Sequence, residues 1–158
     1  VHNLASPYAP ASHAHYHADG NGNVTYLTDT AGATLAAYRY DPYGRWLSGT
    51  GTLASANAMR FSSKLWMGYN GSNTDGLYYY GYRFYDPSTM RWVNRDPLGE
   101  RGDRNLYRFS YNNPIDFVDP NGLWGIQFGD DGRNWGWGDP TFVFDDDSWG
   151  DLGQGGAA

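Results

Sequence analysis

The sequence predicts an all-β fold built from short hairpins. Aromatic residues make up 18% of the 158 residues, 14 of them tyrosines, and 22 residues are glycine. Aromatic side chains favour strands and glycine favours turns, so this composition is typical of short strands joined by tight turns. Up to residue 123, aspartate–proline pairs begin at Asp41, Asp86, Asp96 and Asp119. Each pair can open a turn that closes a hairpin.

The first third of the chain predicts a meander of three short strands. Residues 1–12 contain two prolines and no hydrophobic period, so we expect an extended linker there. Turn signals at 19–22 and 29–32 then separate segments with the composition of strands. The strands are expected at 13–17, 23–28 and 35–40. The Gly-Thr-Gly pattern within 45–53 predicts a loop, and 53–58 could form one helical turn.

The middle of the chain predicts further strands around a polar loop at 70–76. The strongest strand is expected at 77–85, which is nearly all aromatic. Shorter strands are expected at 60–67 and 91–93, whereas 105–109 could be a strand or a helical turn. From Trp124 onward the composition shifts to glycine, aspartate and tryptophan, with one strand-like run at 141–144.

Charge and composition exclude several classes of function. A net charge of -6 and a pI near 4.9 argue against nucleic-acid binding, which needs a basic face. No cysteine is present, so there is no disulfide or thiolate metal site, and no cofactor is expected. No apolar run is long enough to span a bilayer. Because the chain starts at Val1, without an initiating methionine or a signal pattern, we expect a fragment or a processed product.

Two turns bracket the segment from Arg95 to Leu123. They begin at Asp96 and Asp119, and each has proline second and glycine fourth, the preferences of a type I turn. Two carboxylates held close together share a proton, so one can activate water while the other acts as an acid. The Arg95 guanidinium would decide which of them stays charged. The alternative is that both aspartates only cap their own turns.

The residues of this bracketed segment, together with 76–87 and 91–97, closely resemble the RHS repeat-associated core domain. Upstream, Tyr38-Arg39-Tyr40-Asp41-Pro42-Tyr43-Gly44-Arg45 resembles the tyrosine-aspartate (YD) repeat of the same family. The resemblance covers roughly residues 15–123 and favours a short helix at 105–109. It divides the chain into a linker at 1–12, YD-repeat hairpins at 13–66, an RHS core domain at 67–123 and a tail at 124–158.

The resemblance also implies a function. In this family the repeats spiral into a hollow β-shell that the core domain closes, and the shells are associated with toxin encapsulation outside the cell. Aspartates of RHS cores and of the related toxin-complex C subunits are implicated in self-cleavage after an Asp-Pro-x-Gly-Leu motif. The resemblance thus implies Arg95, Asp96 and Asp119 as catalytic residues and Leu123-Trp124 as the bond cut. The 35-residue tail departs from the pattern, because it is too short for a typical toxin domain.

A non-enzymatic filament is the competing hypothesis. Thr141-Phe142-Val143-Phe144 is a short apolar strand on a glycine-rich tether, and it could add to a sheet edge of another copy of the chain. Repeated head to tail, such contacts produce a filament or sheath. The same strand could instead fold back onto its own sheet.

Two further patterns could bind ligands. His13, His15 and His17 alternate along one expected strand, a spacing suited to Zn or Ni, or simply to a polar face on an exposed hairpin. The aromatic run 78–85 could contact carbohydrate, or its rings could pack across neighbouring strands.

Overall fold

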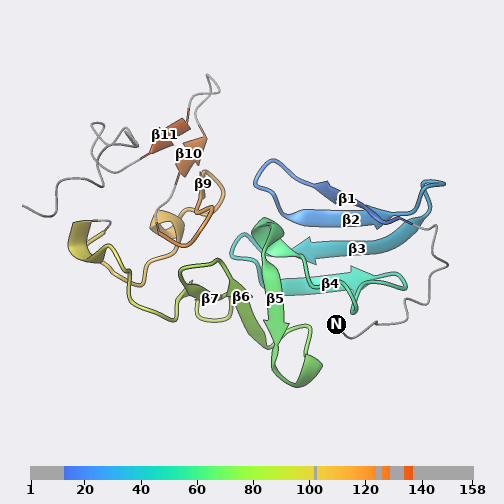
Figure 1. Ribbon diagram of the computed structural model, residues 1–158, viewed down its shortest axis with the longest axis horizontal. Helices are drawn as coiled ribbons and strands as arrows, with labels where there is room; N and C mark the ends of the chain where they lie inside the picture. The colour runs from blue at the N-terminus through green and yellow to red at the C-terminus, as the bar shows by residue number, and fades with distance from the viewer. Residues whose placement is uncertain (1–12, 102, 124–125, 129–133, 137–158) are drawn as a thin grey trace, which may run out of the picture.

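The computed structural model confirms the all-β fold (Figure 1). It describes residues 13–101, 103–123, 126–128 and 134–136. Within these residues the chain forms eleven short strands in three antiparallel sheets, joined by turns and four three-residue helical turns. No α-helix occurs among them, and none of their helical turns is long or apolar enough to cross a membrane. The predicted linker at 1–12 and the predicted strand at 141–144 lie outside the described residues.

The first sheet is a four-stranded meander in the order β1-β2-β3-β4. Its strands are His15–Ala18, Val24–Thr28, Thr34–Tyr40 and Trp46–Thr50. The first three match the expected strands, but β4 replaces the predicted loop at 45–53. Gly49 explains the difference, because it pairs with Tyr38 and leaves room for the Trp46 ring. A Cβ atom at Gly49 would lie 2.0 Å from that ring, so this glycine serves close packing within a strand.

The second sheet has the order β5-β6-β7-β8 and contains the main departure from the predicted strands. Its strands are Leu65–Gly68, Gly76–Tyr79, Phe84–Asp86 and Arg91–Trp92. The single strand predicted at 77–85 is a hairpin, because Gly81 adopts φ +104° and the Tyr80 N–H donates to the Arg83 carbonyl oxygen at 3.1 Å. The strand predicted at 60–67 begins later, after the helical turn η1, Phe61–Ser63.

A third, small sheet pairs β9, Phe117–Val118, with β10, Ile126–Phe128, and then β11, Asn134–Gly136. The short helix favoured at 105–109 is not formed. Arg108 instead forms an isolated bridge with Arg91, and the helical turn η4 follows at Ser110–Asn112. All three residues of η4 have positive φ, so this turn is left-handed. The remaining helical turns are η2, Tyr69–Gly71, and η3, Gly99–Arg101.

The core consists of two clusters that meet at Tyr40. The first lies under the first sheet and contains Val24, Leu27, Leu35, Ala36, Tyr38 and Ala54. The second is almost entirely aromatic and contains Phe61, Trp66, Tyr78, Tyr80, Tyr85, Trp92 and Phe109. Tyr40 packs against both clusters, with its ring 6.1 Å from that of Phe61. Stacked and edge-to-face rings hold the second cluster together.

A turn with the pattern Asp-x-x-Gly recurs along the chain. At Asp19, Asp29 and Asp41 the Oδ1 atom accepts backbone N–H groups two and four residues later. The glycine three residues after each aspartate has φ between +78° and +83°, a conformation that other residues adopt at a cost. Proline after the aspartate is optional, so the repeated element is broader than the predicted Asp-Pro hairpin. The turns at Asp96 and Asp119 also carry a glycine with positive φ at this position.

Candidate functional site

Three buried charged side chains meet beside the second sheet. Arg83 lies between Asp96 and Asp119, with Nη1 at 3.0 Å from Oδ2 of Asp96 and Nη2 at 3.3 Å from Oδ2 of Asp119. The residues are 3%, 6% and 4% exposed, respectively. Two carboxylates therefore share one guanidinium away from solvent.

Each aspartate uses its two oxygens for different purposes. In Asp96, Oδ1 accepts the Leu98 N–H at 2.8 Å, while Oδ2 faces Arg83. In Asp119, Oδ1 accepts the N–H groups of Asn121, Gly122 and Leu123 at 3.2, 2.7 and 3.2 Å. Turn capping, which was the alternative to a catalytic pair in the sequence analysis, thus occurs in both side chains together with pairing to a cation.

Arg83 also contacts the backbone of the second turn. Its Nε donates to the Gly122 carbonyl oxygen at 2.6 Å, and its guanidinium lies 4.1 Å from the centroid of the Trp92 ring. Glycine at position 122 allows the two turns to approach this closely. A Cβ atom there would lie 3.1 Å from the backbone nitrogen of Arg83 and 3.1 Å from Tyr80 Cβ. The hairpin turn at Gly81 aims Arg83 inward from the start of β7.

Burial controls the ionisation of this cluster. Loss of solvent raises the pKa of Asp119, although the backbone N–H of Gly122 and the Arg83 guanidinium oppose the shift. Burial also lowers the pKa of Arg83, and Asp96 and Asp119 oppose that change. Asp119 is therefore the carboxyl group of this cluster whose surroundings favour taking up a proton.

The structure brings together two of the three residues predicted to be catalytic. Asp96 and Asp119 face the same guanidinium, but that group belongs to Arg83, and Arg95 is exposed at the surface. Leu123, on one side of the predicted cleavage site, is half-buried and contacts Asp119, whereas Trp124 lies outside the described residues. The sequence signal for Arg83 is a cation inside an otherwise aromatic run.

The other predicted ligand sites have different surroundings. His13, His15 and His17 are exposed, and the His17 ring contacts the Thr28 hydroxyl at 2.9 Å. No group of three or more His, Cys, Asp or Glu residues in the described part of the chain is placed to hold a metal ion. In the aromatic run 78–85, Tyr78, Tyr80 and Tyr85 are buried in the second core cluster, whereas Tyr79 and Tyr82 are exposed.

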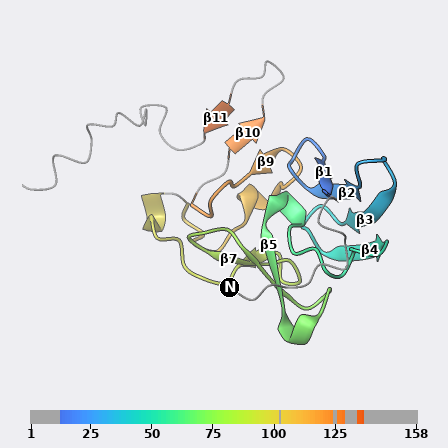
Figure 2. The ribbon, with the colours of Figure 1, turned by 45° about the vertical axis from the view of Figure 1, so that its right-hand side comes forward.

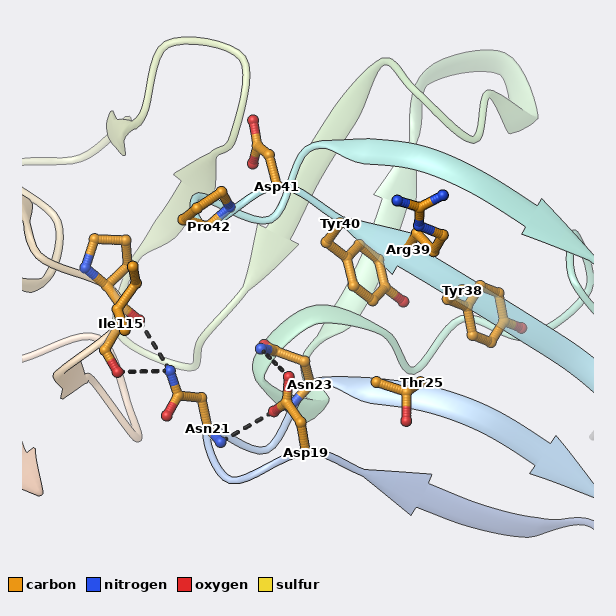
Figure 3. A pocket seen from close by; sticks show the side chains of 11 residues that line it. Asp19, Asn21, Asn23, Thr25, Tyr38, Arg39, Tyr40, Asp41, Pro42 and Ile115 are labelled. Atoms are coloured by element: carbon orange, nitrogen blue, oxygen red, sulfur yellow. Dashed lines mark hydrogen bonds between the residues drawn. The ribbon is translucent and has the colours of Figure 1, made fainter.

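A cavity of about 380 Å³ marks the joint between the first sheet and the segment before β9 (Figure 3). Asn21 Nδ2 donates across this joint to the carbonyl oxygens of Pro114 and Ile115, at 3.1 and 2.9 Å. The Asp19 carboxylate accepts the backbone N–H groups of Asn21 and Asn23 and also the side-chain Nδ2 of Asn23. Figure 2 shows the β1–β2 turn beside β9 from a second direction. The cavity therefore lies along an internal contact between hairpin turns and the core.

Comparison with characterised proteins points to toxins. The chain is 40% identical over 97 residues to toxin subunit YenC1 of Yersinia entomophaga, which covers 60% of this chain and 9% of YenC1. It is 36% identical over 112 residues to double-stranded DNA deaminase toxin A of Burkholderia cenocepacia, which covers 70% of this chain and 8% of that toxin. No family model matches the chain.

Solved structures show the same relationship. The crystal structure of TcdB2-TccC3 without the hypervariable C-terminal region superposes on 75% of this chain with a TM-score of 0.66 and 32% identity, and the match covers 5% of that structure's chain. The chain thus spans about a tenth or less of the length of these toxins. Over that stretch it is a homologue of toxin-complex subunits, and it has their fold.

Proposed function

We propose that this chain is the part of an exported, toxin-complex-like protein that closes a β-shell, and that it cuts its own backbone once, after Leu123. It corresponds to the RHS core with its adjoining YD repeats. Homology to toxin-complex subunits supports the structural role. In such a protein the partner is the rest of the shell, the location is extracellular, and the shell encloses a toxin.

An exposed sheet edge supports the shell role. All four residues of β1 are exposed, and β1 is the outer strand of the first sheet. An edge strand presents backbone groups that another strand can pair with. A preceding hairpin of the shell would cover this edge and continue the sheet.

Contacts between hairpin turns and the core support the closing role. Besides the Asn21 contacts, the Tyr43 hydroxyl donates to the Asn112 carbonyl oxygen at 2.9 Å. The Tyr78 hydroxyl donates to the Gly44 carbonyl oxygen at 3.2 Å. The core segment therefore packs against the turn ends of the hairpins, as expected of a piece that closes a tube of hairpins.

The observation that carries the self-cleavage proposal is the buried group of Asp96, Arg83 and Asp119 directly before Leu123. Asp96, paired with Arg83, takes a proton from water, and the water oxygen attacks the carbonyl carbon of the bond. Protonated Asp119 donates its proton to the leaving nitrogen. One water is consumed, leaving a carboxyl group on one fragment and an amine on the other. Arg83 pairs with Asp96 and takes the part that the sequence assigned to Arg95.

Intact-mass measurement of the full chain tests this proposal. We expect the wild type to yield fragments 1–123 and 124–158, and Asp96→Asn and Asp119→Asn to stay whole. Asparagine keeps an oxygen for the backbone N–H groups but cannot exchange the proton. Asp86→Asn is the matched control, because Asp86 opens a similar Asp-Pro turn but lies outside the Arg83 cluster. It should be cut like the wild type.

The fragment masses also identify the bond. Arg83 holds the Gly122 carbonyl and Asp119 holds the Leu123 nitrogen, so a cut one residue earlier would leave a fragment shorter by one leucine. A wild-type chain that stays whole, or an Asp119→Asn chain that is cut as fast as the wild type, would contradict the proposal.

A filament subunit is the second candidate function. The same exposed β1 edge could accept a strand from another copy of the chain rather than a preceding hairpin. Light scattering of the full chain and of a chain lacking 124–158 separates the two. Filaments that disappear with the tail favour strand addition by the tail, and a monomer in both cases excludes it.

A further inference from the structure

Lys64 is the only lysine in the sequence, and it contacts the turn that precedes the proposed cut. Its Nζ donates to the Pro120 carbonyl oxygen at 2.6 Å and lies 5.1 Å from the centroid of the Tyr80 ring. The side chain is half-buried. Lys64 therefore reaches the turn of Asp119 from a separate element, the junction between η1 and β5.

The backbone of Lys64 is fixed on both sides. Its N–H donates to the Phe61 carbonyl oxygen at 2.9 Å, and its own carbonyl oxygen accepts the Arg60 N–H at 3.0 Å. Phe61 belongs to the aromatic core cluster. The amine is thus carried by a well-packed support, as precise placement of a side chain requires.

Lys64 completes a set of three donors to successive carbonyl groups. The Pro120 carbonyl oxygen accepts from Lys64 Nζ, that of Asn121 from the Tyr82 N–H at 3.1 Å, and that of Gly122 from Arg83 Nε. These are the three carbonyl groups between Asp119 and Leu123. Every peptide plane leading to the proposed cut is held by a donor from outside the turn.

The amine also responds to Asp119 electrostatically. Burial lowers the pKa of Lys64, and the negative charge of Asp119 opposes this shift. The neighbouring Tyr80 is buried, and burial raises the pKa of its hydroxyl, so that group stays neutral. Arg83 is the other cation that faces Asp119. The Asp119 carboxyl group therefore influences the Lys64 ammonium through its charge, without a direct ion pair.

We propose that Lys64 is a positioning residue for self-cleavage, whose ammonium fixes the Asp119 turn through the Pro120 carbonyl and stabilises the Asp119 carboxylate that forms once its proton has passed to the leaving nitrogen. The inference rests on the self-cleavage proposed above. It assigns Lys64 no contact with the reacting atoms.

Substitutions of Lys64 in the full chain test the positioning role. Losing a charged donor slows a step that needs it by about 10- to 100-fold, so we expect Lys64→Met to accumulate fragment 1–123 that much more slowly. Lys64→Gln, which keeps a donor without charge, should be intermediate, and Lys64→Arg should restore most of the rate. The inference is overturned if Lys64→Met is cut as fast as the wild type, or if Lys64→Arg is cut no faster than Lys64→Met. Either result would leave the self-cleavage proposal intact. A wild type that is never cut overturns both.

A spectroscopic titration provides a second readout that a purely structural role would not change. With lysine labelled by ¹³C at Cε, the sole lysine gives one side-chain signal that follows its ionisation. In the uncut Asp96→Asn protein, adding Asp119→Asn removes a negative charge beside Lys64, so the midpoint of the Lys64 titration should fall. Adding Asp86→Asn instead should leave the midpoint unchanged. Equal midpoints with and without Asp119 would overturn the inference.

Discussion

Arg83 is the residue on which the buried charges depend. It neutralises one of two carboxylates that have almost no solvent contact, and it also holds the Gly122 carbonyl. A buried carboxylate without a cation costs much more than an exposed one. The stability of this region should therefore respond sharply to the loss of Arg83.

Replacing Arg83 with methionine keeps much of the side-chain volume but leaves Asp96 and Asp119 without a cation. We expect the free energy of unfolding to fall by about 3–5 kcal/mol. Arg95→Met removes an exposed arginine of the same size, so its effect should stay within about 0.5 kcal/mol. Urea denaturation of both variants in an Asp119→Asn background, which we expect to stay whole and in which Asp96 is the carboxylate left without a cation, provides the comparison. Similar losses in both would contradict the central place of Arg83.

The pKa of Asp119 predicts a pH dependence of stability. Because burial raises this pKa in the folded chain, the folded state binds the proton more tightly than the unfolded state does. The contribution of Asp119 to stability is therefore greatest at low pH. It declines as pH rises from the ordinary aspartate pKa through the folded value. In urea titrations of uncut protein from about pH 4 to about pH 7, Asp96→Asn should show this decline, and Asp96→Asn with Asp119→Asn should show less of it.

The sequence located both carboxylates of the site but not its cation. The Asp-Pro-x-Gly pattern identified Asp96 and Asp119, because each is a local turn signal. Arg95 was chosen since it adjoins Asp96, but adjacency in the sequence does not place two side chains in one site, and Arg95 is exposed while Asp96 is buried. Arg83 reaches the site only through the hairpin at Gly81, which no local pattern predicted.

At the scale of elements, the Asp-x-x-Gly turn connects strands and also packs against the core. Its glycine has positive φ at every occurrence described above, but the surroundings differ. At Gly32 a Cβ atom would meet nothing within 4 Å, whereas at Gly44 it would lie 2.5 Å from the Phe61 ring. The two positions therefore separate backbone strain from steric overlap.

We expect Gly32→Ala to lower the free energy of unfolding by about 1 kcal/mol, from backbone strain alone. Gly44→Ala should cost a further 1–3 kcal/mol or so, because Phe61 must move. Thermal denaturation of the two single variants measures the difference. Equal losses would show that the core accommodates the methyl group freely.

The sequence predicted a strand correctly where a recognisable turn pattern lay beside it. Strands β1 to β3 lie between Asp-x-x-Gly turns, so the sequence predicted them well. Strand β4 was missed because Gly49 resembles a loop residue until the Trp46 ring is seen to lie against it. The β6–β7 hairpin was missed because Tyr80 and Tyr82 suit a strand equally well, and only Gly81 indicates the turn.

At the scale of the whole molecule, the two core clusters form one unit through Tyr40 and Phe61. Phe61 also packs against Tyr78, Tyr85 and Phe109. A change at this junction should therefore affect both sheets together.

We expect Phe61→Ala to lower the free energy of unfolding by about 3–5 kcal/mol. Amide hydrogen exchange should show protection falling by similar factors in β2 and β6, which belong to different sheets. Leu27→Ala, buried in the first cluster alone, is the matched control. Loss of protection in β6 but not in β2 for Phe61→Ala would indicate two independently unfolding parts.

The two carboxylates and the guanidinium come from three turns that are separated along the chain by whole strands. They can meet only after the second sheet has formed and the segment after β9 has docked onto it. A chain that does not complete these folding steps would not be cut. The proposed cleavage would therefore report on folding, because cut molecules have folded and uncut molecules have not.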